Sequence, residues 1–129
     1  MQSYILTEAD VRGNGRFDDA IGLCNSPVDV HEPGGSRAIM DHVGIGYGIP
    51  WRTLVPLDVD NILVAGRCIS VDAIAFGSTR NVPACTMTGE ATAIAAALAA
   101  KRNVPTSAIT APEVQARLKE LGVWLGTPG

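Results

Sequence analysis

Residues 82–102 read VPACTMTGEATAIAAALAAKR, and this segment predicts one long α-helix. Pro83 suits the first turn of a helix, where a backbone N–H has no partner within the helix. Lys101 and Arg102 would complement the negative end of the helix dipole. Asn103 and the proline two residues later predict that the helix ends at about Arg102.

Small residues recur at spacings of three and four along this predicted helix. The set comprises Gly89, Ala93, Ala96, Ala97 and Ala100. One face of the helix is therefore almost without side chains. Such a face can lie very close to a sheet or to a flat ligand.

Two further elements are expected to flank the long helix. Before it, the apolar run at residues 62–66 (ILVAG) is bounded by turn residues, which is typical of a fully buried strand of the parallel type. After it, Thr110 and Glu113 form a capping box that predicts the start of a second helix. Gly122 is well placed just past the end of this helix. Its apolar stripe comprises Val114, Leu118 and Leu121.

The first 50 residues predict an irregular, β-rich segment. Residues 4–6 and 28–30 are short strand candidates. Thr7 can cap one helical turn, which the Gly-Asn-Gly triplet at 13–15 would end. Residues 51–55 are expected to form a loop and a strand.

The glycines at positions 44, 46 and 48 form a GxGxG pattern, which Ile49-Pro50 follows. A dinucleotide-binding fingerprint needs a strand before the glycines and a helix after them, because the helix end holds the pyrophosphate. The pattern therefore favours a strand in which glycines allow close backbone approach.

Composition excludes several classes of protein. The 129 residues suffice for one domain, and 47% are apolar while 18% are charged, which is a globular composition. Thirteen acidic residues against ten basic ones argue against nucleic acid as a partner. The longest apolar run, residues 93–100, is too short to span a bilayer, and residues 1–10 do not resemble a signal peptide. No membrane association is expected.

The three cysteines make an odd and irregularly spaced set, which fits a reducing cytoplasm better than a disulfide framework. Cys68 and Cys85 are expected to be small buried hydrophobes. No metal site is expected. Four residues are of types that can bind metals, but they lack the close paired spacing of a zinc site and are expected to lie in exposed loops. They are Cys24, His31, Asp41 and His42. Trp124 is expected to be a packing anchor or a self-association contact.

Residues 77–80 (GSTR) are expected to form a loop directly before the long helix. A helix N-terminus presents unpaired N–H groups and a partial positive charge, so it suits a phosphate or another anionic group. Arg80 would reinforce that preference. The alternative is an ordinary strand–helix unit whose arginine faces solvent, and spacing alone leaves both interpretations open.

Six stretches together resemble, in order, the C-terminal end of FAD-dependent oxidoreductases, which are large flavoproteins distantly akin to the fumarate reductase and glutathione reductase groups. The stretches are residues 4–11 (YILTEADV), 17–21 (FDDAI), 49–56 (IPWRTLVP), 61–70 (NILVAGRCIS), 77–85 (GSTRNVPAC) and 89–91 (GEA).

This resemblance implies an α/β fold that contains a partial FAD/NAD(P)-binding-like unit. The unit would comprise the buried strand, the long small-faced helix and the C-terminal helix. The chain would then be a single domain, residues 1–129, and a C-terminal fragment of a flavoprotein. Its parts would be a substrate-side, irregular β-rich segment (1–56), the last Rossmann strand with the cofactor-facing helix (57–104), and the C-terminal helix with its tail (105–129).

The resemblance also implies positions for site residues. Gly66 and Arg67 would lie beside the cofactor at the end of the strand. Asn81 and Val82 would offer backbone N–H groups to the N1–O2 edge of the flavin. Gly89 would allow the helix to pack closely on the sheet.

Arg80 could anchor an anionic substrate or the flavin edge, and it is the candidate catalytic residue. The family commonly has a Thr-His-Glu stretch after the positions of Ile69 and Ser70. This chain has Asp72-Ala73-Ile74 there, so a polar cluster on the substrate side is missing.

Two functional hypotheses follow. The first is the C-terminal part of an FAD-dependent oxidoreductase that contributes flavin-edge contacts to two-electron transfer on an unknown substrate. The second is a non-catalytic, self-associating domain that does not bind FAD on its own. FAD is expected in the complete enzyme, and the expected partner is a second copy of the chain or a missing N-terminal FAD-binding half.

Overall fold

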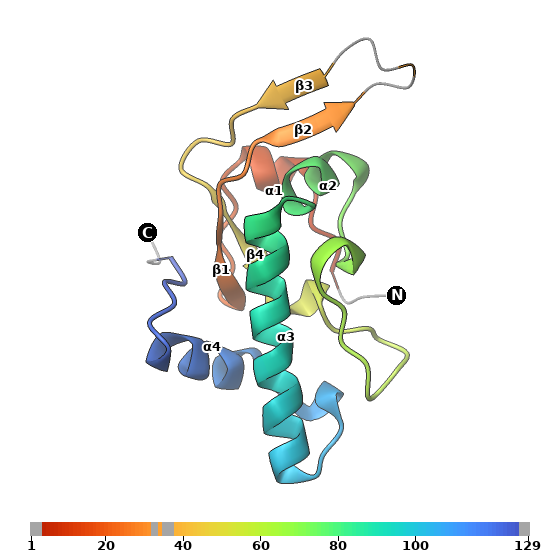
Figure 1. Ribbon diagram of the computed structural model, residues 1–129, viewed down its shortest axis with the longest axis vertical. Helices are drawn as coiled ribbons and strands as arrows, with labels where there is room; N and C mark the ends of the chain where they lie inside the picture. Colours follow the sequence, from red (N-terminus) through yellow and green to blue (C-terminus); the bar gives the residue numbers. More distant parts are fainter. Residues whose placement is uncertain (1–3, 32–33, 35–37, 127–129) are drawn as a thin grey trace.

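The computed structural model describes residues 4–31, 34 and 38–126 of the chain. Helix α1 comes first, four short antiparallel strands follow it, and the other helices come after the strands; the longest helix, α3, runs along most of the molecule (Figure 1). The elements are α1 (Glu8–Arg12), β1 (Ala20–Cys24), β2 (Val28–His31), β3 (Ala38–Asp41), β4 (Tyr47–Pro50), the 3₁₀ helices η1 (Trp51–Thr53) and η2 (Gly66–Cys68), α2 (Ala73–Thr79), α3 (Val82–Arg102), the 3₁₀ helix η3 (Thr106–Ala108) and α4 (Ala111–Glu120).

Both predicted helices are confirmed together with their end signals. Helix α3 has Pro83 in its first turn and ends at Arg102, and its C-cap Asn103 adopts the left-handed conformation with φ 55°. Helix α4 begins at the expected capping box of Thr110 and Glu113, and Gly122 follows it with φ 82°. The predicted stripe of α4 is confirmed at Val114 and Leu118, which are buried, but Leu121 is exposed.

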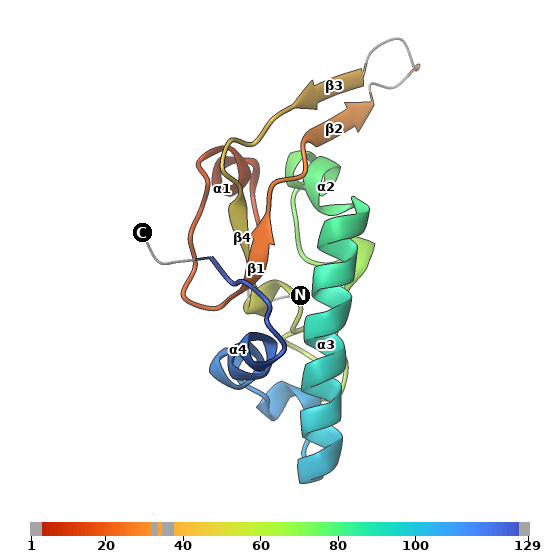
Figure 2. The same cartoon turned by 60° about the vertical axis from the view of Figure 1, so that its left-hand side comes forward.

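The strands form two separate two-stranded antiparallel sheets. Strands β1 and β4 pair with a register shift between Ala20 and Leu23, and β2 pairs with β3 as a hairpin. Figure 2 shows β1 and β4 alongside α3, while the β2–β3 hairpin extends beyond the end of that helix where α2 lies. The β-rich first part of the chain is therefore confirmed.

Residues 62–65 do not form the predicted buried strand. They pair with no strand of the described chain, and Ile62 is exposed. Val64 N–H donates to the Leu54 carbonyl at 2.9 Å, which ties this run to the segment after η1. A buried strand needs neighbouring strands for its backbone groups, and the described residues place none beside this run. The strand of the predicted FAD/NAD(P)-binding-like unit is thus corrected to an irregular segment.

Helix α2 occupies the place of the predicted loop before α3. Its start is set by Asp72, whose Oδ1 accepts from the N–H groups of Ile74 and Ala75 at 3.0 and 2.8 Å. This side-chain cap satisfies two backbone donors that no helical carbonyl can reach. The segment 77–80 therefore belongs to the end of a helix, because Asp72 begins the helix upstream of it.

The first part of the chain confirms one expected helical turn and shows two further corrections. Helix α1 has the expected capping box between Thr7 and Asp10, and Asn14 follows it with φ 53°. Of residues 4–6, only Leu6 makes a strand-like bridge, which is parallel to Val71. Residues 51–53 form η1 instead of a loop and strand.

The GxGxG pattern leads into β4 and not into a helix, so the predicted strand is confirmed at Gly48. Gly44 and Gly46 have φ values of 64° and 94° and form a turn, whereas Gly48 lies within the strand. Gly48 also shows the predicted close approach, since a Cβ there would lie 3.2 Å from the Ala20 side chain.

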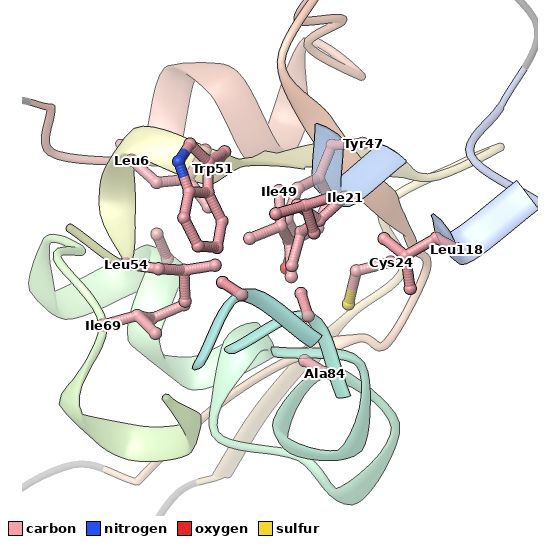
Figure 3. Close-up of a cluster of buried hydrophobic side chains, with 14 of the residues drawn as sticks. Leu6, Ile21, Cys24, Tyr47, Ile49, Trp51, Leu54, Ile69, Ala84 and Leu118 are labelled. Carbon is pink, nitrogen blue, oxygen red and sulfur yellow. The ribbon is translucent and has the colours of Figure 1, made fainter. Parts of the chain in front are cut away.

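The hydrophobic core lies between α3 and the β1–β4 sheet. Figure 3 shows Ile21, Tyr47 and Ile49 from the strands above the helix, with Leu54 and Trp51 beside them. The buried positions of α3 are Ala84, Thr88, Ala91, Ala95 and Ala99. Small side chains on this face let the helix approach the sheet closely.

The predicted small-residue face is not the face that packs. Its four alanines (93, 96, 97 and 100) are exposed. Because α3 carries small residues around most of its circumference, spacing did not determine which side would be covered. By length and composition alone α3 could span a membrane, but the core helix of a soluble protein passes the same test.

Candidate functional site

The N-terminal turns of α3 and the 3₁₀ helix η2 lie against each other. Gly66 begins η2 with φ 62°, and its N–H donates to Oγ1 of Thr88 at 2.9 Å. That hydroxyl in turn donates to the Ala84 carbonyl within α3 at 2.9 Å. A Cβ on Gly66 would lie 3.7 Å from Sγ of Cys85, in ordinary contact. Buried Thr88 thus holds the turn of η2 beside the first turns of the helix.

Backbone donors at the start of α3 remain available. Asn81 N–H donates to the Ser78 carbonyl over a long 3.4 Å, and the first bond of the helix runs from Cys85 N–H to the Asn81 carbonyl. Val82 N–H has no acceptor among the described residues, and Val82 is 77% exposed. Of the two predicted N–H groups, that of Val82 is therefore the one without an acceptor among the described residues.

The Asn81 side chain does not cap α3. Its Nδ2 donates to the carbonyls of Gly77 and Ser78 at 3.3 and 3.1 Å, back toward α2. The two helices are thereby joined at a tight corner. The positive end of α3 stays without a side-chain acceptor, so an external electronegative group would meet it directly.

Arg80 is the C-cap of α2, and its guanidinium is directed to the β2–β3 hairpin. Its Nη2 lies 2.7 Å from Oδ2 of Asp29 and 3.1 Å from the Asp29 carbonyl. The alternative of a solvent-facing arginine is therefore wrong, because the side chain is only 28% exposed and is paired. Its catalytic role stays a prediction, and the observed partner of Arg80 is Asp29.

Arg67 and Gly89 occupy different surroundings. Arg67 is exposed on η2, and within residues 4–31, 34 and 38–126 no carboxylate forms an ion pair with it. Gly89 lies about two turns into α3, where an added Cβ would meet no atom within 4 Å. Close packing of Gly89 on a sheet is therefore wrong for the described fold. Its contact with a cofactor stays a prediction.

The cysteine expectations are partly wrong. Cys24 is buried in β1 instead of lying in an exposed loop, whereas Cys68 is exposed on η2. Cys85 is half-buried, and its Sγ lies 3.5 Å from the Arg80 carbonyl. No group of three potential metal ligands occurs in the part of the chain that the structure describes. Trp124 is 67% exposed and is not a packing anchor.

Sequence reasoning missed a buried hydrogen-bond chain beside this region. Tyr47 Oη donates to Ser78 Oγ at 2.7 Å, and Ser78 Oγ donates to the Ser26 carbonyl at 2.5 Å. Burial raises the pKa of Tyr47, because the phenolate would lose its hydration. These two hydrogen bonds join β4, α2 and the segment before β2, and no local sequence motif predicts them.

A second missed cluster surrounds Arg52. Its guanidinium lies 4.6 Å from the Tyr4 ring and 2.8 Å from Oδ1 of Asp19. Nearby, burial opposes ionisation of Asp10, but the backbone N–H and hydroxyl of Thr7 and the hydroxyl of Tyr4 outweigh it and lower the pKa of Asp10. The Thr7–Asp10 bonds are local, but only three-dimensional contacts bring Arg52 and Asp19 to Tyr4.

Comparison with known protein families shows where the chain belongs. Residues 2–118 match the family described as FAD dependent oxidoreductase, so the chain is a member of that family. The predicted resemblance is thereby confirmed over nearly the whole chain. No curated protein and no solved structure matches the chain.

The residues at the start of α3 fit one edge of a flavin. The Val82 N–H and the uncapped helix end present donors and a partial positive charge. The flavin N1–O2 edge is an acceptor edge, so the two chemistries are complementary. Gly66 is tied to the first two turns of this helix by its bond to Thr88, and Arg67 follows it in η2.

Proposed function

We propose that this chain contributes the flavin-edge contacts of an FAD-dependent oxidoreductase. The observation that carries the proposal is the uncapped N-terminus of a 21-residue helix beside the Gly66 turn. Membership of the family supplies the cofactor class. The residues proposed to contact the flavin are Gly66, Arg67, Asn81, Val82 and Gly89.

FAD, when bound, would supply the two-electron chemistry of the reaction. The role of this chain would be to position the flavin edge and to stabilise its negative charge. Val82 N–H would donate to the acceptor edge of the flavin, and the dipole of α3 would stabilise negative charge that gathers there. The Thr88 hydroxyl would hold Gly66 beside the helix. Arg67 would add a positive charge near the N-terminal end of α3.

The nucleotide half of FAD needs a separate holder. The glycine-rich turn at residues 44–48 leads into β4, so it does not form the strand–turn–helix unit that binds a pyrophosphate. We propose that another polypeptide segment, from an FAD-binding half or a second copy of this chain, supplies that unit. Binding of FAD by this chain alone should consequently be weak.

The test is a titration of the ¹⁵N-labelled chain with FAD, followed through backbone amide shifts. The expected result is a saturable shift of the Val82, Arg67 and Gly66 amides. Val82→Pro removes the backbone N–H at a position where helices accept proline, and the preceding Asn81 already has an extended conformation with φ −72° and ψ 154°. Val82→Ala is the matched control, because it keeps the N–H and removes only the side chain.

The two variants separate the outcomes. Loss of the FAD-dependent shifts in Val82→Pro, with retention in Val82→Ala, would support the proposed contact. Shifts confined to other parts of the molecule, or no shift at all, would refute it for this chain. Repeating the titration at several protein concentrations tests the second copy as a partner, because binding would then strengthen as the protein concentration rises.

A further inference from the structure

A cavity of about 240 Å³ lies between the β1–β4 sheet, α4 and the C-terminal segment. None of its lining residues belongs to α3 or to η2, so it is separate from the proposed flavin edge. Figure 2 shows α4 and the C-terminal segment on the β1 side of the molecule. Its volume is somewhat below that of pockets for drug-sized ligands, which favours a small molecule.

Two cationic side chains line this cavity. Nη1 of Arg16 donates to the carbonyls of Gly46, Asn14 and Gly15 at 2.6, 3.0 and 3.4 Å. These bonds fix the guanidinium, and no carboxylate of the described chain pairs with it. Lys119 of α4 likewise has no ion-pair partner among those residues. The wall therefore carries two positive charges that the described fold does not neutralise by direct pairing.

Gln115, another lining residue, makes a polar bridge beside the cavity. Nε2 of Gln115 donates to the carbonyls of Asp18 and Ala20 at 2.8 and 2.9 Å, and this ties α4 to the start of β1. The carboxyl group of Asp18 is the acidic group among the lining residues. Arg16 and Lys119 also line the cavity, so positive charge exceeds negative charge among the lining residues.

The remaining walls are apolar. Phe17, Leu23 and Leu125 line the cavity from three separate segments. Gly126 lies directly on Leu23 with φ 85°, and an added Cβ would overlap Leu23 Cδ1. The positive φ and this close approach together favour glycine where the C-terminal segment closes this side of the cavity.

We infer that this cavity is a binding site for a small organic anion, a carboxylate on a flat apolar body. The carboxylate would meet the fixed guanidinium of Arg16 and the ammonium of Lys119. The apolar body would lie between Phe17 and the two leucines, where it displaces water from apolar surface. The site lies outside the proposed flavin edge, and the inference does not depend on FAD binding.

Benzoate is the probe, and benzamide is its neutral isostere. In an amide-shift titration at low ionic strength, benzoate should saturably shift the amides of Asp18, Leu23 and Gly126 and the side-chain amide of Gln115. Benzamide should bind about fivefold more weakly, since it lacks the charge that Arg16 and Lys119 attract. A rising salt concentration should weaken the binding of benzoate more than the binding of benzamide.

Variants assign the effect to the charges. Lys119→Gln should lower benzoate affinity by about threefold to fivefold and leave benzamide unchanged. Lys101→Gln is the matched control, because Lys101 lies at the C-terminal end of α3 and outside this cavity. Gly126→Ala should weaken the binding of both probes, because it would displace the C-terminal segment from Leu23.

Three results would overturn the inference. They are equal affinities for benzoate and benzamide, an unchanged benzoate affinity in Lys119→Gln, and the absence of saturable shifts at these amides. Lys119 is exposed on α4, so its replacement tests the charge without relying on the Arg16 contacts that support the fold.

Discussion

Nη2 of Arg80 lies 2.7 Å from Oδ2 of Asp29, and this pair joins the end of α2 to the β2–β3 hairpin. The hairpin has only two strands, which is marginal for stability on its own. The guanidinium also donates to the Asp29 carbonyl, so one side chain contacts both the carboxylate and the backbone of the strand. The pair is consequently a main attachment of the hairpin to the helical part of the molecule.

A double-mutant cycle should detect this attachment. Arg80→Met keeps the aliphatic part of the side chain, and Asp29→Ala removes the carboxylate. Because the pair is partly buried, the coupling should be about 0.5–1 kcal/mol in the free energy of unfolding, measured by urea denaturation. Additive single effects would show that the two side chains do not stabilise each other.

Two glycines in helices should respond oppositely to alanine. A Cβ on Gly77 would lie 2.9 Å from the Asp29 carbonyl oxygen and 2.9 Å from Cγ2 of Val30, so Gly77→Ala should destabilise the fold by about 1–3 kcal/mol. A Cβ on Gly89 would meet open space, so Gly89→Ala should stabilise it by about 0.5–1 kcal/mol. Thermal unfolding of both variants is the measurement, and effects of the same sign would contradict the prediction.

The buried hydrogen-bond chain predicts an order of stability for two variants. Ser78→Ala removes the acceptor of Tyr47 Oη and the donor to the Ser26 carbonyl, and it should cost about 1–3 kcal/mol. Tyr47→Phe removes only the phenolic hydroxyl and leaves the bond from Ser78 to Ser26 in place. It should cost about 1 kcal/mol. Chemical denaturation of both variants measures these costs. A lower stability of Tyr47→Phe than of Ser78→Ala would contradict the predicted order.

Acid should weaken the junction between α3 and α4. The backbone N–H of Thr110, the guanidinium of Arg102 and the Thr110 hydroxyl lower the pKa of Glu113 from its ordinary 4.5 to about 2. Because the folded-state pKa is the lower one, the stabilisation is present above pH 4.5 and is lost as pH falls toward 2.

The comparison protein for this effect is Glu113→Gln, which has no carboxyl group to titrate. The difference in melting temperature between the native chain and this variant should be constant above about pH 5 and should shrink toward about pH 2. A difference that stays constant through this range would show that Glu113 does not stabilise the junction as a carboxylate.

Much of the helical structure was predictable because its signals are local. Pro83, Lys101, Arg102 and Asn103 bracket α3 within a single continuous segment, and Thr110 with Glu113 marks the start of α4. Capping and dipole effects act within one turn, so neighbouring residues suffice to specify them. The family could also be identified from the sequence, because the resemblance consists of short continuous stretches that occur in the same order.

Tertiary contacts decided the rest. Residues 62–65 have the composition of a buried strand, but a strand also needs neighbours, and these are set by distant parts of the chain. Arg80 lies beside a helix end in sequence, yet its charge is paired by Asp29, 51 residues away. Small residues surround α3, so the position of the β1–β4 sheet determined that Ala91 and Ala95 would be buried while Ala93 and Ala96 stay exposed. Local sequence determines where a helix begins and ends, but the partners of its faces and charges depend on where the whole chain folds.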